Sequence, residues 1–108
     1  MARTAALLDS GSAVTVFNME VAALLGIEVT EGEPARVRTQ GGNLDYYLFD
    51  LEMELDLTPR SVRFPARAGF FASHQARNIL GRNLVFSHFL VGFHERRERV
   101  YLQPDRFF

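Results

Sequence analysis

The stretch Phe49-Asp50-Leu51-Glu52-Met53-Glu54-Leu55-Asp56-Leu57 decides the fold class, because apolar and acidic residues alternate in it without a break. Side chains on a strand point alternately to opposite faces, so this period of two predicts a strand with one buried and one solvated face. The segment from Val62 to Ala68 repeats the alternation, with Arg63 and Arg67 on its polar side. Residues 58–60 predict a turn, so we expect an antiparallel pair whose arginines face the acidic row.

On the N-terminal side of this pair, short segments predict two more strands and one helix. Residues 13–17 are mostly β-branched and aromatic, which favours a strand. Asn18 is a suitable N-cap for a helix over residues 19–25, and Gly26 is a suitable stop for it. Residues 35–39 predict a further strand that leads back toward the central pair.

On the C-terminal side, the elements become shorter. Residues 73–78 are polar and predict a loop, and residues 82–86 predict a second short helix. Residues 89–93 and 99–103 flank Glu95-Arg96-Arg97-Glu98, which predicts a C-terminal hairpin. Strand follows strand at short spacing, so we expect a mainly β domain. We expect its largely antiparallel sheet to be closed into a barrel or folded over on itself, with one or two short helices.

The composition limits the classes of function. The chain has 108 residues, of which 47% are apolar and 23% charged, so we expect residues 1–108 to form a single domain with a buried core. The net charge of −1 gives no support for nucleic acid as a partner. No apolar stretch is long enough to predict a membrane span, and no signal peptide is evident, so the expected location is cytoplasmic by default.

Cysteine is absent, which excludes thiolate metal sites and cysteine nucleophiles. His74, His88 and His94 do not have the spacing of a metal motif. We therefore expect a function that needs neither a metal nor another cofactor.

The candidate for chemistry is Asp9-Ser10-Gly11. Apolar residues stand on both sides of it, Leu7-Leu8 before and Val14-Thr15-Val16 after. Apolar residues on both sides predict a turn that is anchored between two core strands, where a carboxylate is held rigidly enough for catalysis. Gly11 allows an N–H to approach the carboxylate, and Ser10 supplies a hydroxyl for a supporting bond. The alternative is an ordinary surface turn, since all three residue types favour turns.

Three segments together resemble the retropepsin-like aspartic proteases. The segment from Leu7 to Val16 resembles the catalytic loop of that family, and Asn78-Ile79-Leu80-Gly81-Arg82-Asn83-Leu84 resembles its second signature. Between them, Thr39-Gln40-Gly41-Gly42 resembles the glycine-rich tip of the family's flap. The order and spacing of the three segments are more specific than any one of them, and the resemblance covers residues 5 to 93. It implies a retropepsin-like barrel and an aspartic endopeptidase that acts on peptides.

The resemblance implies that Asp9 is catalytic and that two copies build the site. The reaction uses one carboxyl group that accepts a proton from water and a second, protonated one that polarises the peptide carbonyl. Only Asp9 among the five aspartates is followed by Ser-Gly, so the second carboxyl is expected from Asp9 of another copy in a two-fold homodimer. Ser10 is expected to lock the two loops across the axis. The Ser12 hydroxyl is expected to bond the ionised carboxylate and to move the optimum of cleavage toward acid pH.

The same resemblance assigns the substrate cleft. The flap, with Gln40, Gly41 and Gly42 at its tip, is expected to close over an extended peptide and to exclude water. Ile79 is expected to line the primary pocket on each side of the scissile bond. Arg77 stands where relatives often have an apolar residue, so it either favours acidic or polar substrate side chains or is a plain exposed loop arginine.

The sequence departs from the family pattern at three places. Only eight residues precede Asp9, where relatives have a further strand and hairpin, so either the domain is shortened at its N-terminus or its dimer is built differently. Ala13 and Val14 stand where viral relatives carry acidic residues, and Arg82 is therefore expected to lack its usual partner. The C-terminal hairpin either supplies much of the dimer interface or packs on its own domain.

The alternative function is a catalytically silent module of the same fold, kept for dimerisation or peptide binding.

Overall fold

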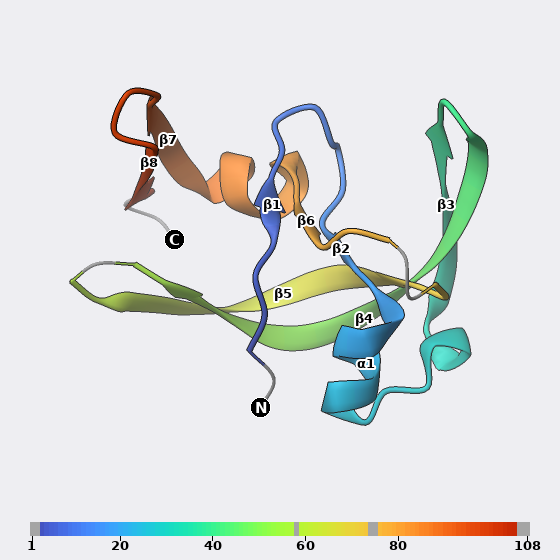
Figure 1. The fold of residues 1–108 in the computed structure, drawn as a ribbon. Coiled ribbons are helices and arrows are strands. Elements are labelled where there is room, and N and C mark those ends of the chain that lie inside the picture. The colour runs from blue at the N-terminus through green and yellow to red at the C-terminus, as the bar shows by residue number, and fades with distance from the viewer. Residues whose placement is uncertain (1–2, 58, 74–75, 106–108) are drawn as a thin grey trace.

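The computed structural model describes residues 3–57, 59–73 and 76–105 (Figure 1). Thr58 in the predicted turn, and His74 and Gln75 in the predicted loop, lie outside the described residues. The elements along the chain are β1 (Leu7–Leu8), β2 (Val16–Phe17), α1 (Met19–Leu25), the 3₁₀ helix η1 (Val29–Glu31), β3 (Glu33–Thr39), β4 (Gly42–Asp56), β5 (Ser61–Phe71), β6 (Ile79–Leu80), the π-helical turn η2 (Arg82–Phe86), β7 (Phe89–His94) and β8 (Arg99–Pro104). The prediction of a mainly β chain with short helices is therefore confirmed.

The strands form an open six-stranded sheet and a separate two-stranded sheet, so the prediction of a closed barrel is wrong. The order in the large sheet is β1-β6-β2-β5-β4-β3, and the second sheet consists of β7 and β8. The prediction of a largely antiparallel sheet is confirmed by the pairs β2–β6, β3–β4 and β4–β5, whereas the short pairs β1–β6 and β2–β5 run parallel. β1, β2 and β6 have two residues each, which gives too few ladder bonds to carry the sheet around to its other edge.

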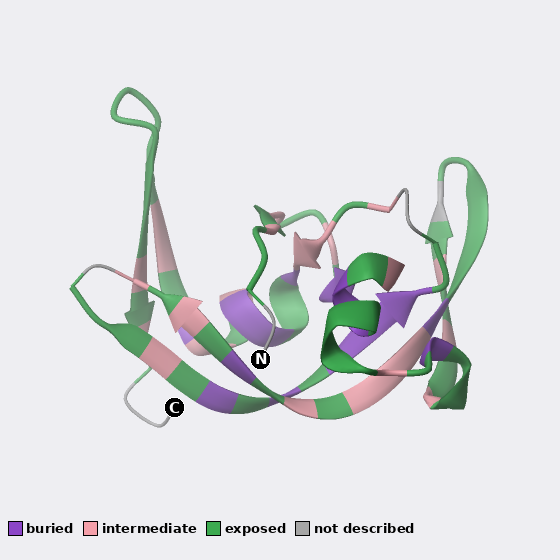
Figure 2. Ribbon diagram, turned by 60° about the horizontal axis from the view of Figure 1, so that its bottom comes forward, coloured by how far each residue is buried: buried purple, intermediate pink, exposed green. Residues whose placement is uncertain are grey.

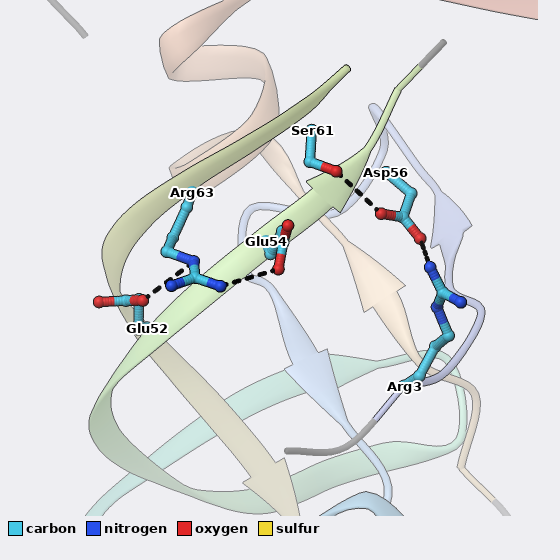
Figure 3. A network of polar contacts seen from close by, with 6 residues as sticks. All are labelled: Arg3, Glu52, Glu54, Asp56, Ser61 and Arg63. Carbon is cyan, nitrogen blue, oxygen red and sulfur yellow. Dashed lines mark hydrogen bonds and ion pairs between the residues drawn. The ribbon is translucent and has the colours of Figure 1, made fainter. Parts of the chain in front are cut away.

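The central pair of strands follows the predicted alternation (Figure 2). Met53 of β4 lies opposite Phe64 of β5, and both side chains are buried. On the outer face, Arg63 contacts Glu52 at 3.2 Å and Glu54 at 3.3 Å, as Figure 3 shows. Exposed ion pairs of this kind contribute about 0.2–1 kcal/mol each. The predicted pairing of arginines with the acidic row is therefore confirmed, but the buried face contributes more to stability.

The helix α1 covers part of the inner face of the curved sheet. The Asn18 side chain accepts from the N–H groups of Glu20 (3.0 Å) and Val21 (3.3 Å), and Gly26 ends the helix with φ of 71°. The predicted helix and both of its ends are therefore confirmed. The helix contributes two residues to the main buried core. The core consists of Phe17, Val21, Ala22, Val29, Met53, Phe64, Ala66, Ala68, Phe70, Leu84, Val85 and Phe89.

Two hairpins rise on the same side of the molecule. The β3–β4 tip lies at one end of this side and the β7–β8 tip at the other, with the loop between β1 and β2 between them (Figures 1 and 2). β7 pairs antiparallel with β8 along its whole length, which confirms the predicted C-terminal hairpin. One side of the molecule thus carries the Asp-Ser-Gly loop and both hairpin tips.

Candidate active site

The loop that carries Asp9 begins beside β6. The Leu7 N–H donates to the Asn78 carbonyl at 2.8 Å, and the Asp9 N–H donates to the Leu80 carbonyl at 3.0 Å. Asp9 is partly exposed, and its Oδ1 accepts from the Gly11 N–H at 2.8 Å. The carboxylate is thus held within its own turn, by the N–H that the sequence predicted for this purpose.

Gly81 packs directly against this loop. A Cβ on Gly81 would lie 2.2 Å from the Val14 carbonyl oxygen and 2.9 Å from the Ser12 carbonyl oxygen, so only glycine fits here. The Gly81 N–H donates to Thr15 Oγ1 at 2.9 Å, and Thr15 is 1% exposed. The Thr15 carbonyl accepts from the Gly69 N–H of β5 at 3.0 Å. The end of the loop is therefore fixed both to β5 and to the residue that follows β6.

Arg82 holds the loop through both its backbone and its side chain. Its N–H donates to the Ser12 carbonyl at 2.9 Å, and its Nη1 donates to the Ser10 carbonyl at 2.8 Å. The sequence predicts an Arg82 without its usual partner, because Ala13 and Val14 replace the acidic residues of relatives. Ala13 and Val14 offer no carboxylate, and the guanidinium instead makes a charge-assisted bond to the backbone of the Asp9 loop.

Ser12 has a different role from the one predicted. Its Oγ donates to the Val14 carbonyl at 2.8 Å and accepts from the Val14 N–H at 3.3 Å. The hydroxyl therefore closes a local turn, as serine commonly does, and does not bond the Asp9 carboxylate. This turn also shortens the predicted strand over residues 13–17, of which only the last two residues pair in the sheet.

Two asparagines join the second signature to the surrounding segments. Asn78 Oδ1 accepts from the Asn18 N–H at 2.8 Å, and Asn78 Nδ2 donates to the Thr4 hydroxyl and the Ala5 carbonyl, each at 3.1 Å. Asn18 Nδ2 donates to the Ala76 carbonyl at 3.2 Å. Sequence reasoning missed this role of Asn78. The available signal was an amide, which both donates and accepts, placed directly before the apolar pair of β6.

The predicted flap is a two-stranded hairpin. β3 and β4 pair over the whole of β3, which leaves Gln40 and Gly41 as the two-residue tip. Gly42 follows with φ of 113°, a conformation that favours glycine. Lower on the hairpin, Arg36 Nε donates to Asp45 Oδ1 at 2.8 Å, and this bond raises the pKa of Arg36 above its usual value. A cross-strand ion pair thus supports the hairpin below a glycine-containing tip.

A second, smaller apolar cluster lies between the base of the β3–β4 hairpin and the Asp9 loop. Its members are Val14, Val16, Ala35, Val37, Tyr46, Leu48, Phe71 and Ala76. Val14 belongs to the loop, Val37 to β3 and Ala76 to the segment that leads into β6. Of the two predicted pocket residues that follow, Arg77 is exposed and Ile79 is half-buried. An apolar wall therefore joins the β3–β4 hairpin, the Asp9 loop and the segment that leads into β6.

One lobe of an aspartic protease is expected to have three parts, and the chain has all of them. They are the Asp9 turn, the contacts of β6 and η2 that hold this turn, and a hairpin with glycine at its tip. The family model for aspartyl proteases matches residues 2–84, a range that contains all three parts. The chain belongs to this family, and the resemblance to retropepsin-like aspartic proteases is confirmed. Family membership supports a peptidase type of activity in general. Comparison with curated proteins and with solved structures found no significant match.

Two further findings concern the described residues alone. Within them, no helix is long and apolar enough to cross a membrane. In the same part of the chain, no three His, Asp or Glu side chains lie together where they would hold a metal ion.

Proposed function

We propose that the protein is an aspartic endopeptidase that works as a homodimer, with one Asp9 carboxyl from each copy in a single site. The strongest support is the rigid frame of Asp9, whose carboxylate accepts from Gly11 in a loop held by Leu80, Gly81 and Arg82. Acid–base catalysis requires carboxyl groups that are fixed in advance in this way. Each chain has only one Asp-Ser-Gly turn, so the second carboxyl comes from a second copy.

The proposed reaction is hydrolysis of a peptide bond by a water molecule held between the two Asp9 carboxyls. Two carboxylates at such close range do not both ionise readily, so the pair shares one proton. The ionised member removes a proton from the water as its oxygen attacks the peptide carbon, and the protonated member gives its proton to the carbonyl oxygen. These two transfers form a tetrahedral intermediate with two hydroxyl groups on the former carbonyl carbon. When its C–N bond breaks, the leaving amine takes a proton from the protonated carboxyl, and one of the two hydroxyl groups gives its proton to the ionised carboxyl. The pair is thus restored, without a covalent intermediate.

The proposed substrate is an extended and largely apolar peptide segment. The β3–β4 hairpin, with Gly41 and Gly42 at and beside its tip, would close over the peptide and pair with its main chain. The wall formed by Val14, Val37 and Ala76 suits apolar side chains, and Ile79 continues it along β6. The exposed Arg77 beside this wall would favour an acidic or polar side chain at one position. Ser10 of each copy would bond the loop of the other across the axis.

The test is the pair of variants Asp9→Asn and Asp50→Asn, assayed with casein at acid pH with and without pepstatin. The asparagine in Asp9→Asn keeps the size of the side chain and an oxygen for the Gly11 N–H, so we expect the dimer and the melting temperature to stay unchanged. Loss of the acid–base group is expected to lower cleavage by about 10²- to 10⁴-fold. Asp50 lies on the exposed outer row of β4, so its substitution is the matched control and is expected to leave cleavage unchanged.

The outcomes separate the proposal from the silent module of the same fold. Cleavage by Asp9→Asn at the rate of the wild type would show that the proposed mechanism is wrong. A wild-type chain that dimerises but cleaves neither casein nor itself, with or without pepstatin, would identify the silent module instead.

A further inference from the structure

The long strand β4 has a neighbouring strand on only one side along its second half. Its first half, residues 42–48, pairs with β3, and residues 46–56 pair with β5. In the described part of the chain, no strand pairs with the other edge of residues 49–56. A free strand edge presents backbone N–H and C=O groups that can pair with a further strand. This half of β4 therefore offers a template for one more strand.

A groove of about 790 Å³ runs along this free edge. Six consecutive residues, Leu51 to Asp56, line it. Because successive side chains of a strand point to opposite faces, such a run lines one groove only where the groove follows the edge of the strand. Thr4 and Ala6 of the N-terminal segment and Val21 and Leu25 of α1 also line it, and both segments lie inside the curve of β4 and β5 (Figure 2). The volume is within the range of binding sites, about 300–1,000 Å³.

The inner side of this groove is apolar. Leu51 and Leu55 are half-buried and pack on the main core, and Met53 is buried between them. Leu25, at the end of α1, is 40% exposed although it lines the same groove. The main core is thus incompletely covered along the edge of β4. A strand added to this edge would cover it with every second side chain.

The outer side of the same edge is acidic. Glu52, Glu54 and Asp56 alternate with the apolar residues, and all three side chains are exposed. Arg63 is shared between Glu52 at 3.2 Å and Glu54 at 3.3 Å, and Arg3 contacts Asp56 (Figure 3). Three carboxylates against two guanidiniums leave an excess of one negative charge. A cationic side chain on an added strand would lie beside this row, where opposite charges attract.

We propose that the β4 groove, defined as residues 51–56 with Ala6, Val21 and Leu25, binds an extended segment of another polypeptide as an additional strand. The segment it fits alternates apolar residues, which face the core, with arginine or lysine, which face the acidic row. Main-chain bonds to β4 supply affinity in this mode, and the alternate side chains supply specificity. No groove residue belongs to the Asp9 turn or to the β3–β4 tip. The inference therefore goes beyond the proposed function and does not depend on cleavage.

The first test titrates a capped hexapeptide that alternates valine and arginine into the whole chain carrying Asp9→Asn, which keeps the peptide intact. Calorimetry measures affinity, and hydrogen exchange locates the contact. We expect the peptide to bind and to protect amides of residues 49–56 that point away from β5. Glutamate in place of arginine, or all valines placed before all arginines, is expected to weaken binding at least about 10-fold. No binding, or protection confined to the β3–β4 tip, would overturn the inference.

The second test asks whether the main chain of the peptide pairs with β4. Alternate residues of a strand direct their N–H groups to opposite edges, so one neighbour uses only every second N–H. Two versions of the hexapeptide are N-methylated at odd or at even positions. We expect one version to lose at least about 10-fold in affinity while the other keeps its affinity. Equal affinities of the two versions would show that side chains alone dock, and would overturn the added strand.

The third test changes the walls of the groove in the same whole chain. Leu25→Ser is expected to weaken the valine–arginine peptide about 5-fold. The matched control is Leu24→Ser, since Leu24 is 68% exposed beside it but does not line the groove. The double variant Glu52→Gln and Glu54→Gln is expected to weaken binding most at low salt, whereas Glu31→Gln leaves it unchanged.

Melting curves show whether each of these variants folds. Equal affinities of the Leu25→Ser and Leu24→Ser chains would place the peptide outside the groove and overturn the inference. Binding that is insensitive to the two glutamine substitutions would overturn the choice of a cationic segment.

Discussion

At the scale of single residues, Thr15 shows how one hydroxyl fixes the Asp9 loop. It stands in an apolar segment, it is buried, and its Oγ1 accepts from the Gly81 N–H. A buried N–H that loses its acceptor carries the full cost of its desolvation, whereas a hydrogen bond between exposed groups is replaced by water. The bond between Thr15 and Gly81 therefore matters more than the exposed ion pairs on the outer face of the sheet.

We predict that Thr15→Val destabilises the chain by about 1–3 kcal/mol, because valine has the shape of threonine but leaves the Gly81 N–H without an acceptor. Urea unfolding at low protein concentration measures the change. The matched control is Thr30→Val, since Thr30 is exposed on η1, and it is expected to change stability by less than about 0.5 kcal/mol. Equal stabilities of the two variants would contradict the role assigned to the Thr15 hydroxyl.

How much of the site could be predicted depends on how local each contact is. The bond from the Gly11 N–H to Asp9 spans two residues and was predictable from the Asp-Ser-Gly triplet. The prediction for Ser12 was wrong because the Val14 backbone, also two residues away, offers its hydroxyl a closer partner than the carboxylate. The role of Thr15 was missed because its partner lies 66 residues further along the chain.

At the scale of elements, the same distinction separates α1 from the sheet. The helix was predictable because its cap and its stop, Asn18 and Gly26, are next to it in the sequence. The strand order of the open sheet was not predictable, because the neighbours of β2 are β5 and β6, which follow it after long intervening segments. η1 was also missed, and it has no side-chain cap that would mark its start. Strand periodicity predicts which face of a strand is buried, but not which strand lies beside it.

The N-terminal segment is attached to β4 by a contact that depends on pH. Arg3 and Ser61 both donate to the Asp56 carboxylate (Figure 3), and the bond from Arg3 is the main cause that lowers the pKa of Asp56 below its usual value. A carboxyl whose pKa is lower in the folded state stabilises the fold above its unfolded pKa of about 3.9. This stabilisation is lost as the pH falls through the lower, folded-state value.

We therefore predict that Asp56→Asn lowers the melting temperature slightly at pH 6 and that the difference from the wild type disappears in strong acid. Thermal unfolding of both chains across the acid range measures it. Glu28→Gln is the control, because Glu28 is exposed and its side chain makes no cap hydrogen bond at η1. A difference for Asp56→Asn that stays constant or grows as the pH falls would show that the carboxylate does not stabilise the attachment.

At the scale of the whole molecule, the fold gathers the Asp9 loop and two hairpin tips on one side. The Asp9 loop, the β3–β4 tip and the β7–β8 tip all lie on one side, and the core lies behind them (Figures 1 and 2). The apolar surface that is left exposed also includes the outer part of the β7–β8 hairpin. This arrangement was not predictable from the sequence, because it depends on how the open sheet curves and on where each hairpin leaves it.

The proposed homodimer makes a quantitative prediction about mixtures. When wild type and Asp9→Asn are mixed in equal amounts, allowed to exchange and assayed at fixed total concentration, only dimers of two wild-type chains hold two carboxyls. Random pairing gives about one quarter of such dimers, so cleavage is expected to fall to about one quarter of that of the pure wild type. Independent single chains would instead retain about one half. Repeating the mixture with Asp50→Asn, which keeps Asp9, is expected to leave the rate unchanged, and a fall to one half with Asp9→Asn would show that each copy cleaves alone.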